Sequence, residues 1–185
     1  MARNGDGNAW RHRQRSRRGG LFGTPRVTGE RKLLDEPQFR FADLYISPFR
    51  WKRQYSVDGV VSYVDMPKPA PTGIRMFDAY LRYLADGNSD LQAFADAHGL
   101  RRDDIDSMIF ILTGMRGVDF RLKFQLRMAA ELLRYTSMSL AEVSLRSGIG
   151  STNNLYLSFK RDFNLAPGYW RLRNRQQGDV GRYKL

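Results

Sequence analysis

Residues 151 to 161 bring together side chains whose chemistry suits recognition of a polyanion. The polar and charged members are Ser151, Thr152, Asn153, Asn154, Tyr156, Lys160 and Arg161. An asparagine amide carries a donor and an acceptor in one plane, which is the arrangement that pairs with the edge of adenine. Lysine and arginine neutralise phosphates. We therefore predict that this stretch binds nucleic acid, with Ser151 near a phosphate and Thr152, Asn153 and Asn154 at base edges.

Covalent and metal chemistry have few candidates in the chain. There is no cysteine, and the two histidines, His12 and His98, are far apart in the sequence. Nucleophile and general-base constellations are therefore sparse, and disulfides and thiolate metal sites are excluded. Asp103, Asp104 and Asp106 lack a fourth ligand and a glycine loop. We predict no metal, no cofactor and no enzyme activity.

The stretch is predicted to lie on the second of two short helices. Ser139 followed by Glu142 is a capping box that opens the first helix. Gly148 ends that helix, because glycine enters the left-handed conformation at no steric cost, and Ser151 is a second N-cap. Leu155, Phe159 and Phe163 then fall four residues apart and are predicted to form one buried apolar stripe. Two helices joined at a glycine turn are the helix-turn-helix pattern, whose second helix enters the DNA major groove.

Further residues extend this pattern on both sides. They are Val143, Gly148, Ile149, Leu155, the run Phe159-Lys160-Arg161 and the run Pro167-x-x-Trp170-Arg171. The combination resembles the second DNA-binding half of the AraC/XylS family of bacterial transcription regulators, although Ser144 stands where the family usually has alanine. The resemblance implies a DNA-binding regulator in which Lys160, Arg161, Arg171 and Arg173 neutralise phosphates and Tyr156 packs on a sugar or a thymine methyl. The alternative is a helical hairpin with a solvated basic face.

The chain contains the same helix-turn-helix pattern twice. The earlier copy has Phe94-Ala95, Gly99-Leu100, Ile105 and Ile109 where the later copy has Val143-Ser144, Gly148-Ile149, Leu155 and Phe159. The offset is 49 residues up to the turn and 50 beyond it, so the later turn has one extra residue. Phe120-Arg121 likewise corresponds to Trp170-Arg171. Two such units joined by a long helix resemble the complete AraC/XylS binding domain, here about residues 74 to 176.

The segment that joins the two copies is compatible with both the hydrophobic period of a strand and that of a helix. Residues 118 to 128 alternate apolar and polar, which is typical of a strand. The residues that also share one helical face are Leu122, Leu126, Ala129 and Leu133. Because AAELLR follows and no turn signal interrupts the run, we predict one helix from about Val118 to Tyr135. Upstream helices are expected from Ile74 to about Gly87, from a Ser89–Gln92 capping box to Gly99, and from about Ile105 to Gly114.

The two copies differ where DNA contacts would lie. The second has Lys160-Arg161 where the first has Phe110-Ile111. The first recognition helix begins with Arg101-Arg102 and continues with Asp103, Asp104 and Asp106. Carboxylates repel phosphates, although one can accept a hydrogen bond from cytosine. We predict that Arg101 and Arg102 contact DNA in a weak or selective first unit.

An apolar patch is expected on the same helix, at Phe110, Ile111 and Leu112. Exposed apolar patches usually mark contacts. We predict that this one packs against residues 33 to 66 or against a partner protein such as RNA polymerase. The alternative is that Phe110 and Leu112 are core residues and that both units bind DNA evenly.

The net charge of the chain also favours a nucleic-acid partner. The chain has 31 Lys+Arg against 19 Asp+Glu, a net charge of +12 and a pI of about 10.4. This balance favours double-stranded DNA over a membrane surface, and no run is long enough to cross a membrane. Residues 1 to 32 contain nine basic and two acidic residues without apolar periodicity. They predict a disordered basic arm that neutralises phosphates, or alternatively a solubilising tail.

The remaining segments are short. Asp58-Gly59, between two β-rich runs, predicts a hairpin with a type I′ turn within residues 33 to 66. A lone hairpin is marginal in water, so this segment should pack on another element. Residues 67 to 73 form a proline-rich linker, and 177 to 185 a tail. The predicted fold class is mainly α: two helix-turn-helix units joined by a long linker helix, preceded by the arm and the hairpin segment.

The sequence therefore predicts a sequence-specific transcriptional regulator in the bacterial cytoplasm, bound at the nucleoid, whose recognition helices enter the major groove and whose second unit dominates. The alternative is an architectural or accessory DNA-binding protein of a mobile element or the nucleoid, and RNA binding through the arm is a third possibility. AraC/XylS-like proteins often carry an effector-binding β-barrel ahead of this domain. Residues 33 to 73 are too short for such a barrel, so control by a small molecule is not expected.

Overall fold

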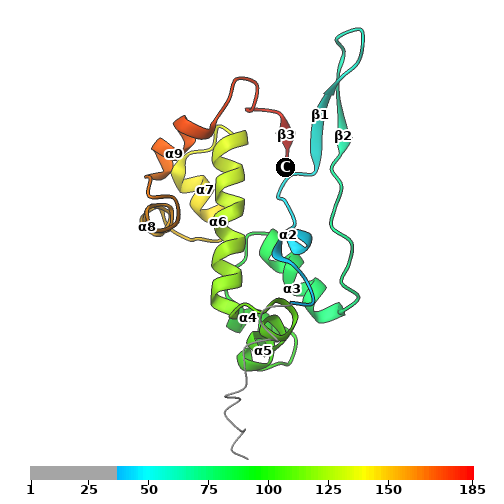
Figure 1. Cartoon of the computed structure of the whole chain (residues 1–185), viewed down its shortest axis with the longest axis vertical. Helices are drawn as coiled ribbons and strands as arrows, with labels where there is room; N and C mark the ends of the chain where they lie inside the picture. The colour runs from blue at the N-terminus through cyan, green and yellow to red at the C-terminus, as the bar shows by residue number, and fades with distance from the viewer. Residues whose placement is uncertain (1–36) are drawn as a thin grey trace, which may run out of the picture. The chain divides into compact units, whose positions relative to one another are not determined.

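Two helix-turn-helix units and the long helix between them are the main feature of the structure (Figure 1). This computed structural model describes residues 37–185, so the predicted basic arm lies outside the described residues and the predictions on it stay predictions. The elements in chain order are α2 (Phe41–Leu44), β1 (Trp51–Tyr55), β2 (Val61–Asp65), α3 (Arg75–Ala85), α4 (Leu91–Ala97), α5 (Arg102–Thr113), α6 (Gly117–Tyr135), α7 (Leu140–Arg146), α8 (Thr152–Phe163), α9 (Pro167–Asn174) and β3 (Tyr183–Lys184).

The long helix α6 connects the two units and packs against elements of both, α5 of the first unit and α7 of the second. The side chains that it buries completely recur at helical spacing, at Phe120, Phe124, Met128, Leu132 and Leu133. Because that spacing places five large apolar side chains on one face in the core, the helix is preferred over the strand that strict alternation also allows. The predicted helix from about Val118 to Tyr135 is confirmed.

The helix starts follow the predicted caps in the second unit and depart from them in the first. Ser139 and Glu142 form the expected capping box, in which the Glu142 N–H donates to the Ser139 Oγ (3.2 Å). At the start of α4, however, the cap is Asp90 and the predicted Ser89–Gln92 box is wrong. The Asp90 carboxylate accepts from the N–H groups of Gln92 (2.9 Å) and Ala93 (3.1 Å), and aspartate caps as well as serine does.

The predicted hairpin forms, but its turn differs from the prediction. Strands β1 and β2 pair antiparallel, with Arg53 opposite Tyr63. The Gly59 N–H donates to the Ser56 carbonyl (3.0 Å) and the Ser56 N–H to the Val60 carbonyl (3.0 Å). Gly59 has φ +76 while Asp58 keeps a negative φ, and a type I′ turn needs positive φ at both central residues. The connection is therefore a three-residue loop closed by Gly59.

The segment ahead of the hairpin packs on the first unit and on α6. The ring of Phe41 lies edge-on to that of Phe120, with centroids 5.6 Å apart. The Tyr45 hydroxyl donates to the Glu131 carboxylate (3.0 Å), as does the Ser47 hydroxyl (2.8 Å). Burial raises the pKa of Glu131 despite these donors. The hairpin segment is thus anchored on another element, as expected for a hairpin that is marginal alone.

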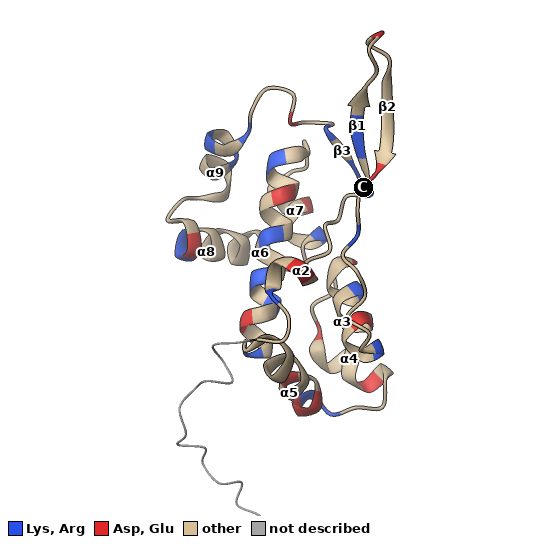
Figure 2. Cartoon of the chain, turned by 45° about the vertical axis from the view of Figure 1, so that its right-hand side comes forward, with Lys and Arg blue, Asp and Glu red and all other residues tan. Residues whose placement is uncertain are grey.

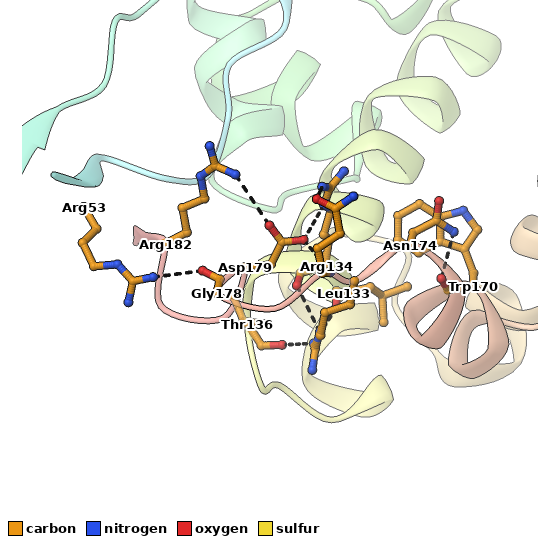
Figure 3. Close-up of polar contacts among 11 residues, drawn as sticks. Arg53, Leu133, Arg134, Thr136, Trp170, Asn174, Gly178, Asp179 and Arg182 are labelled. Atoms are coloured by element: carbon orange, nitrogen blue, oxygen red, sulfur yellow. Dashed lines mark hydrogen bonds and ion pairs between the residues drawn. The ribbon is translucent and has the colours of Figure 1, made fainter. Parts of the chain in front are cut away.

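The last residues of the chain add a third strand to the hairpin, and the buried carboxylate of Asp179 lies in the loop just before that strand (Figure 3). Strand β3 pairs antiparallel with β1, so the strand order is β2-β1-β3. Asp179 is 2% exposed and pairs with Arg134 (2.8 Å) and, more loosely, with Arg182 (3.7 Å). Burial alone raises the pKa of this carboxyl, but the Gln176 N–H and the Arg134 guanidinium outweigh it and hold the pKa below its ordinary range.

Asp179→Asn is expected to destabilise the protein by about 2 kcal/mol at pH 7, because Arg134 and Arg182 lose a buried partner but stay partly hydrated. The folded-state pKa lies below the unfolded one, so this stabilisation is present above about pH 4 and is lost as the pH falls through the folded pKa. Urea unfolding at pH 7 and pH 3 measures both effects. The exposed Asp58→Asn serves as the control, and an equal loss at both pH values would contradict the expected linkage.

Candidate nucleic-acid interface

Helix α8 presents its polar residues to solvent and buries Leu155 and Phe159 in the core. The Ser151 Oγ accepts from the Asn154 N–H (3.1 Å) and fixes the helix start. Opposite the polar face, Leu155 and Phe159 are fully buried. The predicted contact residues that lie exposed along this helix are Ser151, Thr152, Asn153, Asn154, Tyr156, Lys160 and Arg161. The helix thus combines a fixed position with an accessible polar face.

The apolar stripe of α8 ends earlier than predicted. Phe163 is 38% exposed, so the expectation that it is buried with Leu155 and Phe159 is wrong. Its ring still lies 5.0 Å from the Phe159 centroid and 5.6 Å from that of Trp170. Helix α8 ends directly afterwards at Asn164, which has φ 54. The final turn therefore rests on α9 at the edge of the core rather than inside it.

The two cations of α8 differ in their surroundings. The Lys160 ammonium lies 5.9 Å from the Tyr156 ring centroid, within reach of a weak cation–π contact. Arg161 is paired with the neighbouring Asp162 at 2.6 Å, and this hydrogen bond raises the pKa of the guanidinium. A phosphate would have to compete with Asp162 for Arg161. Lys160 is therefore the stronger candidate for a phosphate contact, and Arg173 lies exposed on α9 nearby in the sequence.

Arg171 has a structural position that the sequence did not indicate. It is half-buried and donates to the Met138 carbonyl, just before the Ser139 cap of α7. Burial lowers the pKa of its guanidinium, and nearby Arg175 adds to the effect. Arg121, its repeat partner, donates likewise to the Ser89 carbonyl (2.9 Å). Each arginine thus ties its unit's first helix to the helix that follows the recognition helix. We leave Arg171 out of the interface that we propose.

Helix α5 differs from α8 in the charges that it exposes (Figure 2). Arg101 donates to Asp104 through Nη2 (2.9 Å) and Nε (3.2 Å), and Arg102 lies 3.8 Å from Asp106. Asp103 stands exposed at the same end of the helix. Both arginines are thus held by carboxylates of their own helix, whereas the exposed face of α8 carries one acid, Asp162. This contrast agrees with the predicted weak or selective first unit.

The predicted apolar patch on α5 is smaller than expected. Leu112 is buried at 6% exposure, so its place in an exposed patch is wrong, and its carbonyl accepts from the Phe39 N–H (3.0 Å). Phe110 and Ile111 are 41% and 73% exposed. A contact with a partner protein such as RNA polymerase stays a prediction, and it would use Phe110 and Ile111.

Salt dependence can rank the two units. Lys160→Ala should reduce the slope of log affinity against log salt by about 1, because one phosphate contact is lost. The double variant Arg101→Ala/Arg102→Ala should leave the slope nearly unchanged. Both arginines are paired with carboxylates of their own helix, Asp104 and Asp106, so their removal loses few phosphate contacts. Fluorescence anisotropy of one labelled duplex at several salt concentrations gives both slopes. A larger change for the arginine pair would reverse the predicted order of the units.

The two units touch through a glycine pair that fixes their relative position. A Cβ on Gly148 would lie 2.7 Å from the Gly87 carbonyl oxygen, and a Cβ on Gly87 would lie 2.5 Å from the Arg146 oxygen. The buried Gln125 Nε2, from α6, donates to the Gly148 carbonyl (2.8 Å). The turn of the second unit is thus held against the loop between α3 and α4. The sequence alone does not indicate this role of Gln125, because a polar residue in a helix is usually exposed.

The burial of the Ser144 hydroxyl is compensated by a hydrogen bond within its own helix. It is 1% exposed, and its hydroxyl donates to the Ala141 carbonyl (2.8 Å). A hydroxyl satisfied in this way adds little to the space that an alanine needs. The departure from the family pattern at this position therefore leaves the packing of α7 intact.

The arrangement of two helix-turn-helix units on a connecting helix defines a double helix-turn-helix fold. Among solved structures, the C-terminal domain of AraT, a response regulator from Geobacillus stearothermophilus, matches with a TM-score of 0.51 and 19% identity, over 59% of this chain and 90% of that one. The DNA-binding domain of AdpA, a global transcriptional factor solved with target DNA, matches with a TM-score of 0.48 and 22% identity, over 53% and 90%. No protein-family model and no curated protein matches the sequence.

The likeness to the AraT domain shows the fold. The predicted fold class is therefore confirmed. The extra residue of the second turn is present as well, since α4 and α5 are separated by residues 98 to 101, and α7 and α8 by 147 to 151. Within residues 37–185 no helix is long and apolar enough to cross a membrane.

Proposed function

We propose that the chain is a sequence-specific double-stranded DNA-binding transcriptional regulator whose second unit makes most of the base contacts. The face of α8 carries this proposal. Thr152, Asn153 and Asn154 are exposed at the start of a helix whose other side is anchored in the core by Leu155 and Phe159. In helix-turn-helix proteins, the first residues of the second helix contact base edges in the major groove.

Phosphate contacts would hold α8 in the groove. Lys160, Arg161 and Arg173 are exposed beyond the base-reading residues, and cations near the groove edge set the position of the helix without reading sequence. Tyr156 is 46% exposed between the two groups and can pack on a sugar or a thymine methyl. The same helix thus offers residues for reading and residues for positioning.

The distance between half-sites follows from the rigid connection between the units. Helix α6 and the contact of Gly148 with Gly87 hold the two recognition helices in one relative position. Such a pair would engage two half-sites about one helical turn, or ~34 Å, apart. The acidic start of α5 supports unequal half-sites, with the stronger one under α8.

Competition binding at physiological salt tests the proposed function. The protein is first allowed to select duplexes from a random pool, and its affinity for the selected duplex is compared with that for a scrambled one. A regulator should prefer the selected duplex by about 10³-fold or more. An architectural protein would show little preference and would lose most binding as salt rises, and that result would contradict the proposal.

A further inference from the structure

Strand β2 is the outer strand of the small sheet. Among residues 37–185 the strand order is β2-β1-β3, so one edge of β2 pairs with β1 and the other edge pairs with no described strand (Figure 1). The sequence of β2, VSYVD, has no lysine and no proline, and its register with β1 runs without a bulge. Lysine, proline and bulges are the usual means by which an edge strand is kept from pairing with another chain. The outer edge of β2, where Val61 and Val64 are exposed, is therefore suited to accept a further strand.

The hydrogen bonds of the hairpin show which backbone groups of β2 face outward. The Met66 N–H donates to the Arg50 carbonyl (2.7 Å), and the Ser56 N–H donates to the Val60 carbonyl (3.0 Å). Hydrogen-bonded and non-hydrogen-bonded pairs alternate along an antiparallel ladder. The residues of β2 whose N–H and C=O groups point away from β1 are therefore Val61, Tyr63 and Asp65.

We propose that the outer edge of β2 pairs antiparallel with the same edge of a second copy of this chain. A two-fold axis at Tyr63 places this residue opposite Tyr63 of the second copy, and Val61 opposite Asp65 of the second copy. All three outward-facing residues then lie in hydrogen-bonded pairs, which gives about six backbone hydrogen bonds, two for each pair. A symmetric dimer needs one self-complementary patch, and the edge of β2 supplies it.

The charges at the ends of the strand favour this register. Continued beyond β2, the register brings the exposed Asp58 of each copy opposite the exposed Lys68 of the other. An axis at Ser62 or Val64 would separate these opposite charges and would leave one outward-facing residue of each strand without a partner in the other strand. An axis at Asp65 would set two carboxylates directly against each other, which is unfavourable. The axis at Tyr63 thus combines the most hydrogen bonds with complementary charge.

A dimer joined at β2 contains two complete double helix-turn-helix units. The strands β1 and β2 pack mainly on each other and, through β1, on β3, whereas α8 packs on α7 and α9. The helix α8 of each copy therefore lies outside the proposed interface. The dimer can hold two DNA sites at once, but its formation does not depend on the proposed DNA-binding function.

Sedimentation equilibrium of the full-length protein without DNA tests the dimer. The dimer fraction should rise with protein concentration. Val61→Pro removes an outward N–H of β2 and keeps the inward bonds to β1, so it should weaken the dimer about tenfold or more. Tyr55→Pro is the matched control, because Tyr55 lies directly opposite Val61 and its N–H points to the other edge of the hairpin. This variant should leave the dimer unchanged.

A wild type that stays monomeric at every concentration would overturn the proposal and would leave the edge to a strand of another protein. Equal weakening by Val61→Pro and Tyr55→Pro would also overturn it, because the edge of β2 would then not be the interface. Since DNA is absent, either outcome leaves the proposed function in place.

Disulfide crosslinking tests the register, because the chain has no cysteine. In the proposed dimer Ser62 lies opposite Val64 of the second copy, with Cα atoms about 4.5 Å apart. Ser62 and its own equivalent are diagonal neighbours about 7–8 Å apart, which is too far for a disulfide. A mixture of the Ser62→Cys and Val64→Cys proteins should therefore crosslink on oxidation, and neither protein alone should. No crosslink in the mixture, or equal crosslinking of one variant alone, would contradict the proposal.

Discussion

Replacing Asn153 and Asn154 together by alanine is expected to lower affinity for the preferred duplex about 100-fold. Each asparagine amide can make a paired contact with adenine worth about 1–3 kcal/mol, and 1.4 kcal/mol corresponds to a tenfold change. Affinity for unrelated duplexes should stay the same, because Lys160, Arg161 and Arg173 still neutralise phosphates. Fluorescence anisotropy with both duplexes, at one physiological salt concentration, measures the two affinities.

The control for this pair is Asn88→Ala, which removes an exposed asparagine amide from the loop between α3 and α4. It should change neither affinity. Both variants should unfold at nearly the same urea concentration as the wild type, since Ser151 still caps α8. An equal loss of affinity for preferred and unrelated duplexes would show that the two asparagines do not read bases.

Gly148→Ala is expected to cost about 3 kcal/mol of stability. The residue has φ +76, which a side chain adopts only with strain. The new Cβ would also lie 2.7 Å from the Gly87 carbonyl oxygen, which is backbone and cannot rotate away. Relief of this contact requires the second unit to move relative to the first, so affinity for a two-half-site duplex should fall as well. Urea unfolding measures the loss of stability.

Gly150→Ala is the matched control in the same turn. Gly150 also has positive φ (+89), but a Cβ there would meet nothing within 4 Å. Its cost should be about 1 kcal/mol, the strain of the left-handed backbone alone. The difference between the two variants isolates the contact of Gly148 with Gly87. Equal losses would show that this contact does not hold the units together.

Sequence reasoning found the elements whose signals are local. The Ser139–Glu142 box, the Ser151 cap and the alignment of Gly99 with Gly148 each depend on residues close together in the chain, and the structure has the corresponding helices and turns. The long helix was also predicted in preference to a strand, because the helical run AAELLR follows and no turn signal interrupts the segment. Local hydrogen bonds and side-chain periodicity are sufficient at these positions.

Features that depend on distant partners were missed. Arg171 has the residue type of a phosphate ligand, and only the fold shows that it donates to the Met138 carbonyl. Asp179 sits in a run without apolar periodicity, yet Arg134, 45 residues earlier, buries it in an ion pair. Nothing in the spacing of Gly87 and Gly148 indicates that their backbones touch. Exposed and buried forms of the same side chain cannot be told apart without the partner.

The turn and cap errors have a common cause. Asp58-Gly59 and Ser89 each fit a standard signal, but a neighbouring residue or one more loop position fits as well. Asp90 caps α4 in place of Ser89, and the loop closes one residue wider at Gly59. Signals of this kind therefore show that a turn or a helix start is present more reliably than they show at which residue it lies.

Selection of duplexes from a random pool, by the wild type and by the Asn153→Ala/Asn154→Ala variant in parallel, tests most directly whether α8 reads DNA. The wild type should enrich two unequal half-sites about one helical turn apart. The variant should lose the preferred bases of the stronger half-site only, and keep those of the weaker one. If both proteins enriched the same motif, or if neither enriched any, α8 would not be the reading element of this chain.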